Sequence, residues 1–239
     1  MGRQGTRPEG RPAARKKDPR PKPAYHHGDL RKALLDAARA LLREGGPDAC
    51  SLREIARRAG VSHAAPYHHF KSLEQLLAAV AEQGFMDMDR TMMEAQGAAP
   101  PDAEAQLVAV GMGYIVFARR DSSLFRLMIA PEYIGPPQPG SPLELAGPYA
   151  RLLSGLARLR GLPAPAVCGP DADAHLCWAT VHGVAQLELD SALGVDGLAY
   201  ARVLVERLVR ALAIIPRVAL VEPVPKRMAA KPRRRSAGG

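Results

Sequence analysis

Two stretches of the chain begin with a serine that is followed three residues later by a glutamate or glutamine. The first is Ser51-Leu52-Arg53-Glu54 and the second is Ser72-Leu73-Glu74-Gln75. In such a capping box the serine hydroxyl and the longer side chain each satisfy an exposed N–H group at a helix start. The two boxes therefore predict helices that start at residues 51 and 72, with only a short segment between them.

Apolar residues at helical spacing extend on both sides of these boxes. Residues 30–42 form one apolar stripe, with Asp29 as the predicted N-cap and Gly45-Gly46-Pro47 as the stop. The helix that starts at Ser72 is predicted to run to about residue 93, before a break at 97–101. Further helices are predicted at about 102–120, 122–130, 142–160, 171–193 and 197–215. Since no alternating strand pattern is present, the sequence predicts an all-α fold.

Residues 51–70 have the form of a helix-turn-helix. Gly60 stands where the tight turn needs a positive φ, and Val61 is predicted to fill the gap between the helices. Ser62 can cap a short second helix at about 63–69, with Pro66 near its first turn. Small and polar side chains on such a helix allow it to enter the major groove of DNA.

The stretch from Tyr25 to about residue 85 closely resembles the DNA-binding domain of the TetR (tetracycline-repressor) family. The residues that carry this resemblance are Ile55-Ala56, Ala59-Gly60-Val61-Ser62, Tyr67, His69-Phe70-Lys71-Ser72 and Leu76-Leu77. The resemblance implies a three-helix DNA-binding head with a linking helix at 25–88. It also implies an all-α body at 89–216 that binds an effector and dimerises.

Eight residues around the motif are the predicted DNA contacts. Tyr67 matches a family position that meets the DNA backbone, while the cation of Lys71 suits a phosphate. The alternative roles are a packed tyrosine, a solvated lysine and, for the two serines, capping alone. His69 is predicted to pack beneath the linking helix. The eight are Ser51, Arg53, Ser62, His63, Ala64, Tyr67, His68 and Lys71.

A second resemblance lies in the body. Trp178, His182 and Gly183 are similar to the Trp-x-x-x-His-Gly signature of one subgroup of TetR C-terminal domains. The resemblance implies an effector pocket, which we expect to be apolar, although apolar residues at helical spacing also form plain core. The candidate lining residues are Met112, Ile115, Val116, Phe125, Met128, Ile129, Tyr149, Leu153 and Trp178.

The resemblance also implies that the last two helices pair with their copies in a four-helix bundle. One apolar face of the last helix is marked by Leu198, Ala201, Val205, Leu208, Val209 and Leu212. A monomer could bury the same stripe internally. The expected protein is a ligand-responsive transcriptional regulator, a repressor, that binds a palindromic operator as a homodimer and is released by a small molecule.

Most of the basic charge lies in two tails. Residues 1–27 carry eight Lys or Arg against two acids, and residues 217–239 carry seven against one. Since residues 1–24 and 217–239 hold few residues that could form a core, both are predicted to be disordered. The alternative function is therefore a DNA-binding or architectural protein without sequence specificity, driven by these tails.

Other classes of function find little support. No nucleophile-base pair, phosphate loop or paired-carboxylate motif indicates an enzyme, and no cofactor is expected. The histidine pairs His26-His27 and His68-His69 point in different directions, and His175 with His182 gives only two ligands, so no metal site is expected. No apolar run reaches membrane-spanning length, and three cysteines give no disulfide framework. A cytoplasmic location is expected.

Overall fold

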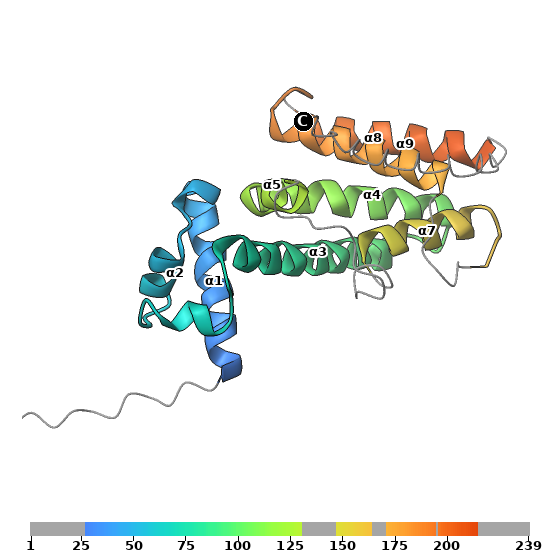
Figure 1. The fold of residues 1–239 in the computed structure, drawn as a ribbon. Coiled ribbons are helices and arrows are strands. Elements are labelled where there is room, and N and C mark those ends of the chain that lie inside the picture. The colour runs from blue at the N-terminus through green and yellow to red at the C-terminus, as the bar shows by residue number, and fades with distance from the viewer. Residues whose placement is uncertain (1–26, 131–146, 164–170, 195, 215–239) are drawn as a thin grey trace, which may run out of the picture.

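The fold is described by a computed structural model of the protein at residues 27–130, 147–163, 171–194 and 196–214 (Figure 1). The helices are α1 (His27–Gly45), α2 (Leu52–Arg58), α3 (Leu73–Ala98), α4 (Ala103–Arg120), α5 (Ser122–Ile129), α7 (Pro148–Leu159), α8 (Ala172–Leu189) and α9 (Gly197–Ile214). Two short 3₁₀ helices, η1 (Pro47–Ala49) and η2 (Ala65–His68), lie in the N-terminal part. No strand occurs within the described ranges, and the predicted all-α fold is confirmed.

The helix starts follow local capping chemistry. The hydroxyl of Ser51 accepts from the amide of Glu54, and that of Ser72 accepts from the amide of Gln75, as the two boxes predict. Asp102 and Asp171 cap α4 and α8 in the same way. Helix α1 departs from its predicted start, since it begins at His27, two residues before Asp29.

The N-terminal head consists of α1, α2, η2 and the start of α3. Gly60 has a φ of +70°, as the predicted turn requires. The helix predicted at 63–69 is instead a turn at residues 62–64 followed by η2. Pro66 explains the difference, because it has no N–H to donate to the carbonyl of Ser62 four residues earlier, where an α-helix would form its first hydrogen bond. Ser62 uses its backbone carbonyl to accept from the amide of Ala65 at 3.0 Å, rather than capping a helix with its side chain.

The body stacks its helices in three layers (Figure 1). Helix α4 lies between α3 on one side and the pair α8 and α9 on the other. Two glycines of α4 permit this close packing. A Cβ on Gly113 would lie 2.7 Å from the Cα of Met92 in α3, and one on Gly111 would lie 3.0 Å from Val205 in α9.

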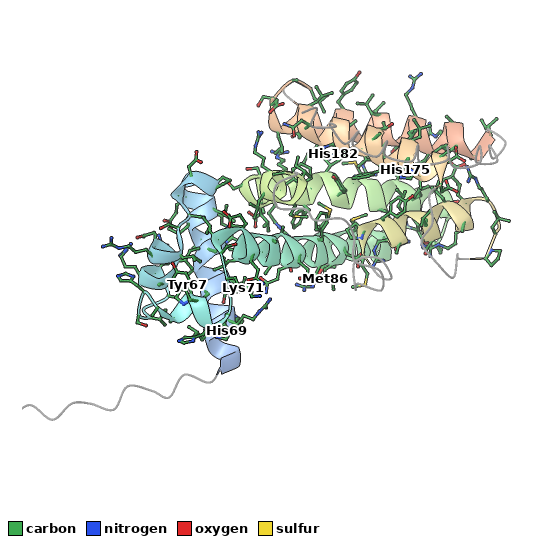
Figure 2. All side chains as sticks on the ribbon, in the orientation of Figure 1. Tyr67, His69, Lys71, Met86, His175 and His182 are labelled. Atoms are coloured by element: carbon green, nitrogen blue, oxygen red, sulfur yellow. The ribbon has the colours of Figure 1, made fainter. Side chains whose placement is uncertain are left out.

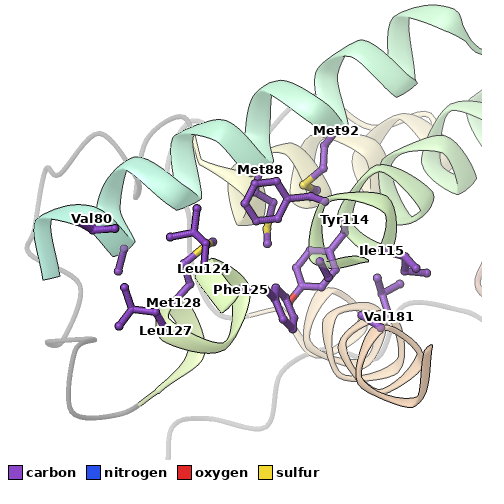
Figure 3. Close-up of a cluster of buried hydrophobic side chains, with 14 of the residues drawn as sticks. Val80, Met88, Met92, Tyr114, Ile115, Leu124, Phe125, Leu127, Met128 and Val181 are labelled. Atoms are coloured by element: carbon purple, nitrogen blue, oxygen red, sulfur yellow. The ribbon is translucent and has the colours of Figure 1, made fainter. Parts of the chain in front are cut away.

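The core of the body is rich in methionine and aromatic side chains (Figure 3). Phe125 and Met128 of α5 are fully buried, and Met128 packs against α3 at Gly84, where an added Cβ would lie 2.5 Å from Sδ of Met128. This core also includes Ile115, Leu124 and Leu127. The linking helix α3 runs unbroken through the predicted boundary at residue 88, so the head and the body share one continuous helix.

The apolar stripe of α9 packs inward. Ala201, Val205, Val209 and Leu212 are buried, and they face the α4 and α8 side of the body. The stripe is therefore buried within one chain, which is the alternative that the sequence left open. Helix α7 begins at Pro148, and the first residues of the helix predicted at 142–160 lie outside the described residues, as do both basic tails. Within the described ranges, no helix is long and apolar enough to cross a membrane.

Candidate nucleic-acid interface

The outer end of the head carries all eight predicted DNA contacts. They come from the start of α2, the turn at 62–64, η2 and the residue before Ser72, and Figure 2 labels Tyr67 and Lys71 among them. Every one of the eight side chains is exposed: Ser51, Arg53, Ser62, His63, Ala64, Tyr67, His68 and Lys71. Tyr67 is a strongly exposed aromatic residue of this surface, and 63% of its surface area is accessible to solvent. All eight residues therefore lie exposed in the head, which forms one end of the molecule (Figure 1).

Buried neighbours hold this surface in place. Pro66 and Phe70 are buried, and the amide of Phe70 donates to the carbonyl of Pro66 at 2.9 Å. Ile55 and Ala56 of α2 are fully buried beneath the turn. His69 is half-buried with its ring centroid 6.4 Å from that of Phe70. The exposed residues are thus fixed by an alternation of buried and exposed positions over 65–71.

The start of α3 adds a local positive potential to this surface. The amide of Lys71 donates to Oε1 of Gln75 at 2.6 Å, while the amide of Gln75 donates to the hydroxyl of Ser72 at 3.2 Å. Because the first N–H groups of a helix carry partial positive charge, an anion is favoured near this start. The ammonium of Lys71 stands beside it and is exposed.

The arginines of α2 divide into paired and unpaired groups. Arg57 forms a bidentate ion pair with the carboxylate of Glu54, and Arg58 forms an ion pair with Glu44 of α1. These bonds hold the pKa of Glu54 and of Glu44 below the usual range. Arg53 and Lys71 have no carboxylate within ion-pair distance in the described part of the chain, so both charges remain available to phosphate.

The nine predicted effector residues do not meet in one place. Ile115, Phe125 and Met128 are fully buried in the core, while Met112 and Leu153 are nearly so. Ile129 and Tyr149 are half-buried, and Val116 and Trp178 are exposed. Only two of the nine, Met112 and Val116, line an open groove of about 480 Å³. Its other lining residues are Thr91 and Ala95 of α3, Gly113 of α4, and Leu198, Ala199 and Arg202 of α9.

A polar pair within the body was missed by the sequence reasoning. The hydroxyl of Tyr114 in α4 lies 2.9 Å from Nδ1 of His182 in α8. Burial raises the pKa of Tyr114 to about 12, with a hydrogen bond from Trp178 acting in the opposite direction, and burial lowers the pKa of His182. Trp178 and His182 thus share one hydroxyl partner. Their spacing of four residues was the available signal, but nothing local indicated Tyr114.

The described residues hold no group of three histidine, cysteine, aspartate or glutamate side chains that could bind a metal. His175 instead places Nδ1 2.7 Å from the carbonyl oxygen of Asp171. Its ring lies 5.5 Å from that of Tyr149, so it belongs to an aromatic contact between α7 and α8.

Comparison with known proteins fits this architecture. Residues 34–80 match bacterial regulatory proteins of the tetR family, and residues 107–212 match the tetracyclin repressor-like C-terminal domain. The chain belongs to the TetR family. The first match lies in the DNA-binding head and the second in the body of this TetR-family protein. The subgroup implied by Trp178, His182 and Gly183 stays a prediction.

Curated relatives of this TetR-family protein are transcriptional regulators. BetI of Rhizobium meliloti (strain 1021) is 38% identical over 90 residues, which are 37% of this chain and 44% of BetI. The transcriptional activator FasR of Mycolicibacterium smegmatis is 30% identical over 118 residues, 49% of this chain and 53% of FasR. The matches thus span about half the length of these relatives or less.

Solved structures support the fold. A protein of unknown function from Rhodococcus sp. RHA1 is 33% identical, with a TM-score of 0.63, and the match covers 80% of this chain and 100% of that one. FadR of Bacillus subtilis in complex with stearoyl-CoA is 17% identical, with a TM-score of 0.50 over 74% of this chain and 97% of FadR. The likeness to FadR shows the fold alone.

Proposed function

We propose that this TetR-family protein is a ligand-responsive transcriptional repressor that binds a palindromic operator as a homodimer. The observation that carries the proposal is the head, where all eight predicted contacts are exposed. Among the described residues, Arg53 and Lys71 have no carboxylate within ion-pair distance. Release from the operator by a small-molecule effector completes the proposal. A cytoplasmic location is part of it.

The experiment that tests this proposal is a selection of genomic DNA fragments by the purified protein. It is run at about 150 mM salt, where phosphate attraction alone is weakened. The full chain is compared with a chain that lacks residues 1–24 and 217–239. One enriched palindrome that survives removal of the tails supports the proposal. Diffuse enrichment that is lost with the tails supports the alternative, DNA binding without sequence specificity.

Substitution of Tyr67 by phenylalanine sharpens this test. Tyr67→Phe keeps the ring and removes only the hydroxyl, so we expect weaker binding to the selected palindrome with an unchanged fold. Ser154→Ala in α7 is the control, because it also removes a single hydroxyl but lies in the body, outside the head and outside α8 and α9. Equal operator affinity for both variants and the unsubstituted protein would contradict a role for this hydroxyl in the interface.

The outer face of α8 and α9 supports the homodimer. Leu176 and Leu187 of α8 are 49% and 45% exposed, while Tyr200 and Val203 of α9 are 51% and 46% exposed. These two helices are neighbours and lie on the far side of α4 from α3 (Figure 1), and we assign their four exposed side chains to one apolar surface. A large exposed apolar surface is typical of a protein–protein contact. This is the surface that we assign to the partner copy, in place of the inward stripe of α9.

Two features of the body support an apolar effector. The core beside Tyr114 contains several methionines, which adapt their shape readily to a bound molecule. The groove beside Met112 and Val116 is lined mainly by apolar residues, and Arg202 is its one charged lining residue among those the structure describes. The FadR relative of the same fold holds stearoyl-CoA. A thermal-shift screen of apolar compounds, followed by release from the selected operator, tests this part of the proposal, and stabilisation without release would contradict it.

A further inference from the structure

Asp121 occupies the corner between α4 and α5, where an aspartate normally caps the following helix. Asp102 and Asp171 do cap their own helices, with amide-to-carboxylate distances of 2.7 Å and 2.9 Å. Asp121 makes no such bond to α5, although it stands at the N-cap position. Its side chain is only 8% exposed. A buried carboxylate needs partners to offset the loss of water, and here they come from another part of the molecule.

The partners of Asp121 are two arginines of α1 in the head. Arg43 Nη2 lies 3.1 Å from Oδ2 of Asp121, and Arg39 Nη2 lies 3.7 Å from the same atom. Arg39 also donates through Nη1 to Oδ2 of Asp87 in α3 at 2.7 Å. The two arginines are four residues apart, so they lie on one face of α1. Two positive and two negative groups thus join the head, the linking helix and the body.

We propose that Asp121 is a positioning residue that fixes the orientation of the DNA-binding head against the body. Helix α3 is the covalent connection between these parts, and a single helix can bend or rotate under load. The contact of α1 with α5 is a second attachment, and Asp121 is its buried charged element. An orientation fixed at two points restricts the swing of the head.

The inference adds a specific role to the proposed function and rests on it for its consequence on DNA. The recognition elements of a dimer must meet major grooves about 34 Å apart. A head that moves freely therefore loses conformational entropy when it binds, and this loss lowers the affinity. Loss of the Asp121 contact is expected to lower operator affinity about tenfold. It is also expected to weaken the preference for one half-site spacing, because the head then adapts to neighbouring spacings.

The test measures head orientation directly, without DNA. Spin-label amino acids are placed at Arg53 in α2 and Arg158 in α7 of the full chain, and both sites are exposed. The labelled protein is diluted with unlabelled protein so that distances within one chain dominate. Asp121→Asn keeps the size of the side chain and removes its charge. We expect a broadened or shifted distance distribution for this variant and a narrow one for the unsubstituted protein.

Asp89→Asn is the matched control. Asp89 lies two residues from Asp87 on α3 and accepts two bonds from Arg151 of α7, at 2.7 Å and 2.8 Å, so its ion pair joins two body helices. We expect this control to lower stability without changing the head-to-body distance. Arg43→Gln is the second test variant, because its side chain is 59% exposed and its loss does not endanger folding.

The outcomes separate the two proposals. Unchanged distance distributions in both Asp121→Asn and Arg43→Gln, with folding verified by circular dichroism, would overturn the positioning role. So would an equal change in the Asp89→Asn control. If the distances change as expected but the protein selects no operator, the positioning role stands and the proposed function fails.

Discussion

At the level of single residues, the head separates side chains that hold the fold from those that are free to bind. Arg57 and Arg58 form ion pairs with Glu54 and Glu44. Within the described ranges, Arg53 and Lys71 form no ion pair with a carboxylate. Phe70 is buried while its neighbours Tyr67 and Lys71 are exposed. Counting basic residues in the sequence could not separate these groups, since pairing depends on which helices lie side by side.

Lys71 gives a prediction about salt. In Lys71→Ala, each subunit of the proposed dimer loses one phosphate contact, so operator affinity falls and the slope of log K against log salt concentration becomes shallower by about 1.8. Fluorescence anisotropy of a labelled operator at several salt concentrations measures this slope. Arg158→Ala in α7 is the control, since Arg158 is an exposed cation of the body that belongs neither to α8 nor to α9. A slope that is unchanged in Lys71→Ala would argue against a phosphate contact.

His182 gives a prediction about pH. Burial holds its pKa below the ordinary value of 6.5, so the folded protein binds fewer protons at this ring than the unfolded chain does. The contribution of His182 to stability is therefore complete above about pH 6.5 and decreases as the pH falls through that value. We expect the free energy of unfolding to drop between about pH 7.5 and pH 5.5, and to drop less in His182→Gln.

Urea unfolding at several pH values measures this difference. His175→Gln is the control, because His175 lies on the same helix but is exposed (Figure 2). If His182→Gln and His175→Gln show the same pH dependence as the unsubstituted protein, the buried ring is not the titrating group.

At the level of helices, local signals were reliable where the neighbours of a residue are close in sequence. The capping serines at 51 and 72 bond as predicted, and Gly60 adopts the predicted positive φ. The second hydrogen bond expected of the first capping box, from the amide of Ser51 to the side chain of Glu54, is replaced. The carboxylate of Glu54 accepts from Arg57 instead. The extent of the helix predicted after Ser62 was wrong, even though the relevant signal, Pro66, is itself local.

The close approach of α3 and α4 gives a prediction at this scale. Gly113→Ala would place a Cβ 2.7 Å from the Cα of Met92, and backbone atoms cannot move aside as a flexible side chain can. We expect a loss of about 1–3 kcal/mol in the free energy of unfolding. Gly97→Ala in α3 has no heavy atom within 4 Å and is expected to be neutral or slightly stabilising. Similar losses in both variants, measured by urea unfolding, would contradict the close contact.

At the level of the whole molecule, α3 joins a DNA-binding head to a three-layered body, and the surface at each end differs in character. The head presents exposed polar and basic groups, while α8 and α9 present leucine, tyrosine and valine side chains. This division fits a protein that meets DNA at one end and a second copy of itself at the other. Helix α4 packs against one face of α8 and one face of α9, so the opposite faces of these two helices stay exposed.

The outer face of α8 and α9 gives a prediction about assembly. Val203→Lys places a charge within this apolar surface, so we expect a dimer to dissociate at micromolar concentration and operator affinity to fall at least tenfold. Sedimentation velocity measures the change of mass. Met93→Lys in α3 is the control, because Met93 is also half exposed, at 50%, but lies on another face. Dissociation in the control alone, or in neither variant, would exclude this face as the dimer contact.

The sequence by itself determined the all-α class and the positions of most helices, because caps, turns and helical periodicity depend on residues within a few positions of one another. The resemblance of its motif residues indicated the TetR family. Tertiary structure alone decided which face of α9 is buried, why Tyr114 meets His182, and why Asp121 turns from its own helix to Arg39 and Arg43. In each of these cases the partner lies far away in the sequence. A helical stripe records that one side is apolar, and only the packing of whole helices determines what covers it.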